Sequence, residues 1–292
     1  MNKKATVKDV AREAGVSVAT VSYIMNNRTD MKISEATRKK VLQIANLLDY
    51  IPSHAAKSLA TGRNNVIGIS YHLNDRTFAR NLEISNIVNL LIRRLNRLGY
   101  DVMYMPFQSD CPSPVSGRTV DAILAIDLTE KEFSILSNSF MVPIINIDMI
   151  INDPLFYQIY TDYGNLLKKA DSIVGDDFII LSNTFANEIY REYIFSDINP
   201  EKVFFISDFN KDRFKDLGTK KVIIIGTYTA LTACGYANPD NSVIISSNKP
   251  DILISGGFHF IENDIQKKAN LAINILLNSI DKKFDLDHIY KI

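Results

Sequence analysis

The chain has 292 residues, of which 46% are hydrophobic and 23% charged. This length suits about two domains, and the composition excludes a disordered or fibrous protein. The N-terminal segment MNKKATVKDVAREAG has no apolar core, and no apolar run is long enough to cross a bilayer. We therefore expect no signal peptide, no membrane span and a cytoplasmic protein. We expect Cys111 and Cys234 to be free thiols, which excludes a disulfide framework.

The net charge is zero overall but unevenly distributed along the chain. Residues 1–63, called the head here, hold eleven Lys and Arg against five Asp and Glu, a net charge of +6. Residues 64–292, called the body, therefore carry a net charge of −6. A basic head on an acidic body is typical of a small module that docks on phosphates.

The head begins with two short helical patterns. Thr6 and Asp9 have capping-box spacing, and apolar residues follow at helical intervals up to Gly15, which ends the first helix. Ser17 can cap a second helix. The residues expected on its buried stripe are Val21, Ile24 and Met25. Two short helices joined by a glycine-containing turn predict a helix-turn-helix.

A third helical pattern begins at Ser34 and supplies the apolar face that the first two helices need. The residues expected to point inward are Val41, Ile44, Ala45 and Leu48.

The second helix of such a unit enters the major groove with its first residues against the base edges. Val18 and Ala19 can offer only apolar contact, for example to a thymine methyl group. Thr20, Ser22 and Tyr23 can hydrogen-bond to bases or phosphates. Any one of these residues could simply be solvated, but two capped helices in a basic segment together indicate DNA binding.

The segment TVKDVAREAGVSVATVSYIMN (6–26), followed by SEATRKKVLQIANLLDYIPSHAAKSLATGR (34–63), resembles the lactose-repressor-like (LacI/GalR) family of bacterial transcription regulators. The resemblance covers almost the whole head. It implies a homodimeric repressor that reads a palindromic operator in duplex DNA. The residues expected to contact DNA are Thr6, Ser17, Val18, Ala19, Thr20, Ser22, Tyr23, Asn26, Arg28, Ser53, His54, Lys57 and Leu59.

The resemblance also implies a hinge helix over Pro52 to Leu59 that folds only on DNA. Leu59 would then insert into the minor groove as an apolar wedge, which unstacks a base step and kinks the duplex. The alternative is that Leu59 is a linker residue that packs on the body. Ala60 stands where many members have a basic residue, so one phosphate or groove contact would be missing.

The body alternates short β-branched runs with helical patterns, which predicts parallel sheets covered by helices on both faces. The expected strands are residues 66–71, 101–106, 122–126, 143–148, 178–183, 203–207, 222–226, 242–246 and the final HIYKI. Helices are expected over the apolar spacing from Ile84 to Leu95 and roughly over 262–280. The alternation of strands and helices begins again near residue 156. We therefore expect two α/β lobes with a ligand cleft between them.

The predicted fold is therefore an all-α helix-turn-helix head with a hinge helix, joined to a two-lobed α/β body. The resemblance implies that this body is a periplasmic-binding-protein-like effector domain. We expect the DNA-binding domain at 1–51, the hinge helix at 52–63 and the effector-binding and dimerisation domain at 64–292. Within the body, lobe 1 is expected at about 64–156 and lobe 2 at about 157–292.

The resemblance also places a small-molecule effector between the lobes. The residues expected to contact it are Asn74, Phe78, Asp148, Arg191, Thr227, Tyr228 and Asn248. Two strand ends depart from the family pattern, since 246–248 read Ser-Ser-Asn in place of a sugar-binding Asp and 226–228 read Gly-Thr-Tyr in place of Asn-Asp. The family's arginine in the second lobe has no clear counterpart, and Arg191 lies near that place.

The body is also shorter than is typical of the family, mostly between residues 207 and 222. The changed strand ends, the missing arginine and the shorter body suggest two hypotheses. Either the effector, a sugar in many relatives, is not an ordinary free sugar here, or the body acts mainly in dimerisation.

No catalytic constellation is found, so we expect a protein that is not an enzyme and has no cofactor. The four histidines lack metal-ligand spacing, and neither a nucleophile elbow nor a phosphate-binding glycine loop occurs. The expected partners are operator DNA, a small molecule and a second copy of the chain, with no membrane. The competing hypothesis is a small-molecule-binding or sugar-processing α/β protein with an incidental basic head.

Overall fold

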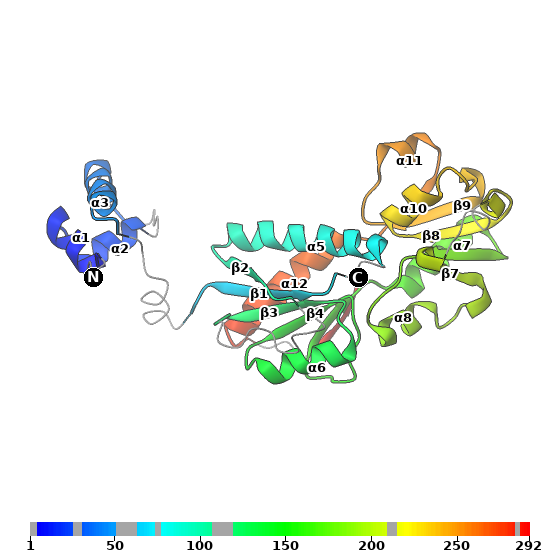
Figure 1. Cartoon of the computed structure of the whole chain (residues 1–292), viewed down its shortest axis with the longest axis horizontal. Helices are drawn as coiled ribbons and strands as arrows, with labels where there is room; N and C mark the ends of the chain where they lie inside the picture. The colour runs from blue at the N-terminus through cyan, green and yellow to red at the C-terminus, as the bar shows by residue number, and fades with distance from the viewer. Residues whose placement is uncertain are drawn as a thin grey trace. The chain divides into compact units, whose positions relative to one another are not determined.

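Figure 1 shows a computed structural model of the chain. The described residues are 5–25, 31–50, 63–73, 77–106, 119–208, 215–283 and 287–292. The chain divides into two compact units, Met1–Asn64 and Asn65–Ile292. Each unit has its own apolar core.

The first unit contains three helices, α1 (Val7–Ala14), α2 (Val18–Met25) and α3 (Glu35–Leu47). Gly15 ends α1 in the left-handed conformation (φ 67°), which glycine adopts without a steric penalty. The three helices share one core, whose buried residues are Val10, Ala11, Ala14, Val21, Ile24, Val41 and Ala45. The predicted helical head is therefore confirmed.

Three side chains that were predicted to point inward, Met25, Ile44 and Leu48, are only partly buried and pack at the edge of this core. The predicted hinge helix at 52–63 lies outside the described residues except for Arg63.

The first lobe of the body is built on a parallel sheet with the strand order β11-β5-β4-β3-β1-β2. Its strands are β1 (Val66–Tyr71), β2 (Asp101–Tyr104), β3 (Ala122–Ile126), β4 (Ile144–Ile147), β5 (Tyr157–Tyr160) and β11 (Ile289–Lys291). Helices α5 (Phe78–Arg97) and α12 (Ile265–Ile280) cover one face, and α6 (Glu130–Ser139) covers the other. Each face of the sheet has its own apolar core, and alternate residues of β3 belong to one or the other. Leu124 packs in the core under α5 and α12, and Ile123 packs in the core under α6.

The second lobe is built on a parallel sheet with the order β10-β9-β8-β6-β7. Its strands are β6 (Phe178–Ser182), β7 (Val203–Phe205), β8 (Lys221–Ile225), β9 (Ser242–Ser246) and β10 (His259–Glu262). Helices α7 (Tyr163–Val174) and α8 (Glu188–Phe195) pack on one face, and α10 (Thr227–Ala233) and α11 (Asp251–Ser255) on the other. Short 3-10 turns lie at Pro200–Lys202, Ile206–Asp208, Asp216–Thr219 and Pro239–Asn241.

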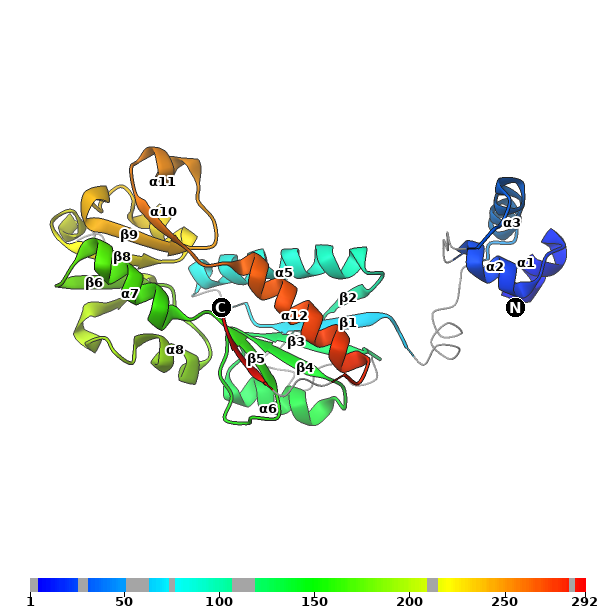
Figure 2. The same ribbon diagram turned by 180° about the vertical axis from the view of Figure 1, so that it is seen from behind.

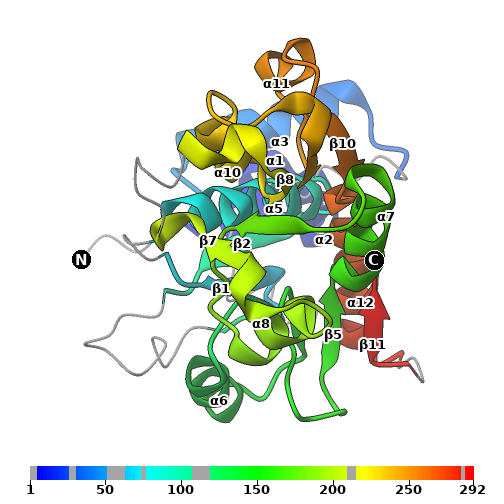
Figure 3. The same ribbon diagram turned by 90° about the vertical axis from the view of Figure 1, so that its right-hand side faces the viewer.

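The lobe ranges expected from the sequence are wrong for three elements. Strands β5 and β11 pair in the first sheet, and α12 packs on the first lobe's core, although all three fall in the range expected for lobe 2. Figures 2 and 3 show α12 beside β5 and β11. An edge position of a parallel sheet can be filled by a strand from any part of the chain. The sequence order therefore does not reveal that α12 and β11 come back to the first lobe.

The chain passes into the second lobe at Thr161–Asp162 and comes back at Asn263–Asp264. These two crossings are tied together, because the Thr161 hydroxyl donates to Asn263 Oδ1 at 3.0 Å. Within the described residues, no helix combines the length and apolar character that a membrane span requires.

Candidate nucleic-acid interface and inter-lobe site

The start of α2 presents its first residues to solvent. Ser17 caps the helix, since its Oγ accepts the Thr20 N–H at 3.0 Å and lies 2.8 Å from Thr20 Oγ1. Ser17, Val18 and Ala19 are exposed, while Val21 is fully buried. The helix therefore has one anchored face and one outward face at its N-terminal turn.

The other predicted DNA contacts in the head divide into three groups. Thr20, Ser22 and Tyr23 are half-buried along α2. Thr6 is exposed and closes a reciprocal cap at the start of α1, because its N–H donates to Asp9 Oδ2 at 2.9 Å. The predicted contacts that lie outside the described residues are Asn26, Arg28, Ser53, His54, Lys57 and Leu59.

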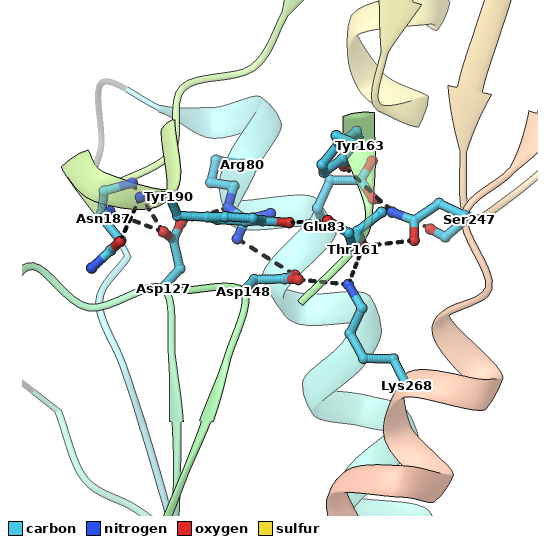
Figure 4. A network of polar contacts seen from close by, with 12 residues as sticks. Arg80, Glu83, Asp127, Asp148, Thr161, Tyr163, Asn187, Tyr190, Ser247 and Lys268 are labelled. Atoms are coloured by element: carbon cyan, nitrogen blue, oxygen red, sulfur yellow. Dashed lines mark hydrogen bonds and ion pairs between the residues drawn. The ribbon is translucent and has the colours of Figure 1, made fainter. Parts of the chain in front are cut away.

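The body buries a charged cluster between its lobes (Figure 4). Asp127 and Asp148 follow the neighbouring parallel strands β3 and β4, so both carboxylates reach the same edge of the sheet, where ligands bind in open α/β folds. Both residues have left-handed backbone, with φ of 48° and 52°. Such conformations are uncommon outside glycine and are over-represented at functional sites.

Arg80 and Lys268 supply the positive charges of this cluster. Arg80 Nε donates to Asp127 Oδ2 at 2.6 Å, and Arg80 Nη2 lies 3.7 Å from Asp148 Oδ2. Lys268 Nζ donates to Asp148 Oδ1 and to Thr161 Oγ1, both at 2.6 Å. Each buried carboxylate therefore has a cation beside it, as buried charges require.

Burial and ion pairing move the pKa values of the cluster in different directions. Burial raises the pKa of Asp127, and the adjacent Arg80 offsets this only in part. Burial also disfavours the Asp148 anion, but Lys268 and then Arg80 outweigh it and hold the pKa of Asp148 below its ordinary value. Burial disfavours the Arg80 cation as well, yet Asp127 and Asp148 together raise the pKa of Arg80.

The cluster also joins the two lobes. Asp127 Oδ1 accepts the N–H groups of Ala186 and Asn187 from the second lobe, at 3.0 and 3.2 Å. The Asn187 side chain donates to the Leu128 carbonyl at 3.1 Å and accepts the Ile150 N–H at 3.1 Å. These bonds hold the beginning of α8 against the strand ends of the first lobe.

A second link crosses the lobes at Glu83 of α5. Its Oε1 accepts the Thr227 N–H at 2.8 Å, and its Oε2 accepts the Ser247 hydroxyl at 3.3 Å. Nearby, the rings of Phe78 and Tyr228 meet edge to face with centroids 5.2 Å apart.

Residues of both lobes that the structure describes enclose a small cavity. Arg80, Glu83, Asp148, Asn183 and Lys268 are among the residues that line a cavity of about 20 Å³. A space of this size holds about one water molecule. Arg80 Nη2 and Asn183 Oδ1 are buried there with no hydrogen-bond partner among the described residues, so both can still bind a small polar group.

The structure brings together only some of the predicted effector contacts. Asp148 lies in the charged cluster, and Thr227 contacts Glu83 through its backbone. Arg191 instead pairs with Glu188 on α8 at 2.9 Å, and Asn248 is exposed with its carbonyl accepting the Ser246 hydroxyl. Asn74 lies outside the described residues.

Sequence reasoning missed Arg80, Glu83, Asp127 and Lys268. Two of them carried a recognisable signal, because each lies on the apolar stripe of its helix at intervals of three or four residues. The stripes run through Arg80, Ile84, Ile87 and Leu91 and through Lys268, Ala272 and Leu276. A lone cation on such a stripe indicates a buried charge with a partner.

A three-helix head and a body of two parallel α/β lobes make up the architecture of the Lac repressor. A solved Lac repressor dimer bound to operator and an anti-inducer superimposes on 99% of this chain and 96% of its own, with a TM-score of 0.69 and 18% identity. The transcriptional regulator CelR in complex with cellobiose has the same fold, with a TM-score of 0.55 and 15% identity, covering 99% of this chain and 97% of its own.

Residues 6–53 match the family model of the bacterial regulatory proteins of the lacI family, so the head of this chain is similar to that family. The HTH-type transcriptional repressor PurR of Vibrio vulnificus is 30% identical over 180 residues, which cover 59% of this chain and 48% of that protein. The catabolite control protein A of Streptococcus mutans is 48% identical over 64 residues, which cover 22% of this chain and 19% of that protein. The chain thus spans about half the length of PurR.

Proposed function

We propose that the chain is a sequence-specific DNA-binding transcription regulator, a repressor, that binds an inverted-repeat operator as a homodimer. The observation that carries the proposal is the exposed first turn of α2, where Ser17, Val18 and Ala19 face outward from an anchored helix in the basic head. A helix presented in this way fits the major groove, and the surrounding basic residues contact phosphates.

A selection from random duplexes, made with the full chain, tests this function. We expect enrichment of one inverted repeat and an affinity that falls steeply with salt. The Ala19→Glu variant should lose binding, because a carboxylate placed at the base edges is repelled by the DNA. Leu47→Glu is the matched control, since Leu47 is 82% exposed at the end of α3. No preference for any inverted repeat over random duplex would refute the proposal.

The homodimer is supported by apolar side chains exposed on three helices of the body. The exposed residues are Phe78 and Leu82 on α5, Leu231 on α10, and Ile252 and Ile254 on α11. Figures 1 and 2 show these three helices on the same side of the body. An exposed apolar face of this kind is typical of a protein–protein interface. We expect analytical ultracentrifugation to give a dimer, and Ile252→Glu to weaken it.

The proposed effector site lies between the lobes, around Asp148 and Thr227. The cavity of about 20 Å³ that the described residues enclose there is too small for a sugar, so a sugar that binds at this cavity needs the lobes to separate. Calorimetric titration against a metabolite panel distinguishes the two hypotheses for the body. Tight binding of a simple hexose or pentose excludes a non-sugar effector, and any ligand that changes operator affinity excludes a body that only dimerises.

A further inference from the structure

Glu83 connects the lobes through hydrogen bonds from neutral groups, whereas the carboxylates of the charged cluster are paired with cations. It belongs to α5 of the first lobe, and both of its carboxylate oxygens accept hydrogen bonds from the second lobe, namely the Thr227 N–H and the Ser247 hydroxyl. Figure 4 shows the Glu83 side chain directed toward Ser247 across the inter-lobe space. Hydrogen bonds to an ionised carboxylate are stronger than those between neutral groups.

A glycine precedes the Thr227 N–H that Glu83 accepts. Gly226, immediately before Thr227, has φ of 100°, a conformation that L-residues rarely adopt. A Cβ added there would lie 3.0 Å from Asn183 Nδ2 and 3.5 Å from Glu83 Oε1. The contact with Asn183 would be tight and the contact with Glu83 ordinary, so the bare backbone at this position accommodates the Asn183 side chain.

The cations of the site are already paired with other residues. Arg80 pairs with Asp127 and Asp148, and Lys268 pairs with Asp148. Glu83 is thus held by two neutral donors of the second lobe, the Thr227 N–H and the Ser247 hydroxyl.

We infer that Glu83 acts as an internal latch that closes the two lobes without any bound small molecule. This inference deepens the proposed function, because it concerns how the effector site of that regulator is controlled. The carboxylate satisfies the donors of the second lobe from within the chain. A small molecule that uses the Thr227 N–H and the Ser247 hydroxyl must first displace Glu83, so its binding competes with closure.

The lobe separation can be measured by double electron–electron resonance between two spin labels on the full chain. Labels at Lys131→Cys on α6 and Glu192→Cys on α8 report on the two lobes, since both positions are exposed. The background carries Cys111→Ser and Cys234→Ser. With no small molecule added, we expect one short distance for the parent protein.

Two variants remove opposite halves of the latch. Glu83→Ala removes the carboxylate. Thr227→Pro removes the donor N–H, and proline is tolerated at the first position of a helix such as α10. We expect both variants to shift the main distance to a longer value. Asn86→Ala is the matched control, because Asn86 is exposed on the same helix as Glu83, and it should leave the distance unchanged.

Two results would overturn the latch. One is an unchanged short distance in both folded variants, as checked by circular dichroism. The other is a parent protein that is open alone and closes only when a metabolite is added. Operator binding, measured in parallel by gel shift, separates the two proposals: a parent protein that binds no operator refutes the regulator, while the distances still decide the latch.

Discussion

Lys268 and Asp148 stand 120 residues apart in the chain, and their side chains form a buried ion pair of 2.6 Å. The lysine comes from α12 and the carboxylate from the end of β4. The pair therefore joins a helix near the end of the chain to a strand near its middle, within the same lobe. Because Lys268 also donates to Thr161 at the lobe crossing, the pair lies where the two lobes meet.

The first prediction concerns the stability that this pair maintains. Asp148→Asn leaves Lys268 without its nearest anion in a buried position, which should lower the free energy of unfolding by about 3–5 kcal/mol. Urea denaturation at neutral pH measures this change. The matched control is Lys202→Met, which breaks the exposed pair between Lys202 and Asp177 and should leave stability unchanged. Equal effects of the two substitutions would show that the buried pair has no special role.

The second prediction concerns acid stability. The folded-state pKa of Asp148 lies below its ordinary value because Lys268 and Arg80 outweigh burial. Its contribution to stability is therefore complete above about pH 4, the pKa of an unfolded Asp, and is lost as the pH falls through the folded pKa. We expect the stability difference between the parent protein and Asp148→Asn to shrink below about pH 4. A difference that stays constant down to acid-induced unfolding would contradict this.

The third prediction concerns Asn187, which is fully buried and links the lobes. Its side chain bonds to Leu128 and Ile150 of the first lobe and caps α8 through the Tyr190 N–H at 2.9 Å. Asn187→Ala leaves these buried groups without partners, which should cost roughly 1–3 kcal/mol for each group that water cannot reach. Asn199→Ala removes a similar cap from an exposed 3-10 turn and should cost about 1 kcal/mol or less. Thermal unfolding of the two variants tests the comparison.

The fourth prediction rests on the proposed function and concerns base preference. Asparagine recognises adenine through two hydrogen bonds, so Ala19→Asn at the exposed start of α2 should favour adenine at one position of each half-site, by about 1–3 kcal/mol. Selection from random duplexes measures the change, and Leu47→Asn on α3 should leave the preference as it was. An altered preference in only one half-site would argue against a symmetric dimer.

Local patterns predicted much of the fold. The capping residues Thr6 and Ser17 mark the starts of α1 and α2, and the β-branched runs at 66–71 and 122–126 coincide with β1 and β3. Strands β5 and β10 were not predicted, because each has only four residues and no long β-branched run marks it in the sequence. The lobe to which α12 belongs was predicted wrongly, since its apolar stripe fits either core.

The site was predicted less completely. Asp148 was expected there from the resemblance, and it does lie at the end of β4 in the charged cluster. Arg191 was expected from the resemblance, yet it pairs with Glu188 on its own helix, and Arg80 on α5 provides the buried guanidinium instead. Several positions expected to contact DNA or effector, Leu59 and Asn74 among them, lie outside the described residues and remain predictions.

The order of residues alone was sufficient to identify the head, its three helices and the α/β character of the body, because caps and apolar periodicity act over a few neighbouring positions. It could not reveal that Lys268 meets Asp148, that Arg80 meets Asp127, or that Glu83 reaches Thr227. The first two pairs form only when the first lobe has folded, and the third only when the two lobes pack together. A buried charge is stable only beside a partner that folding has placed within bonding distance.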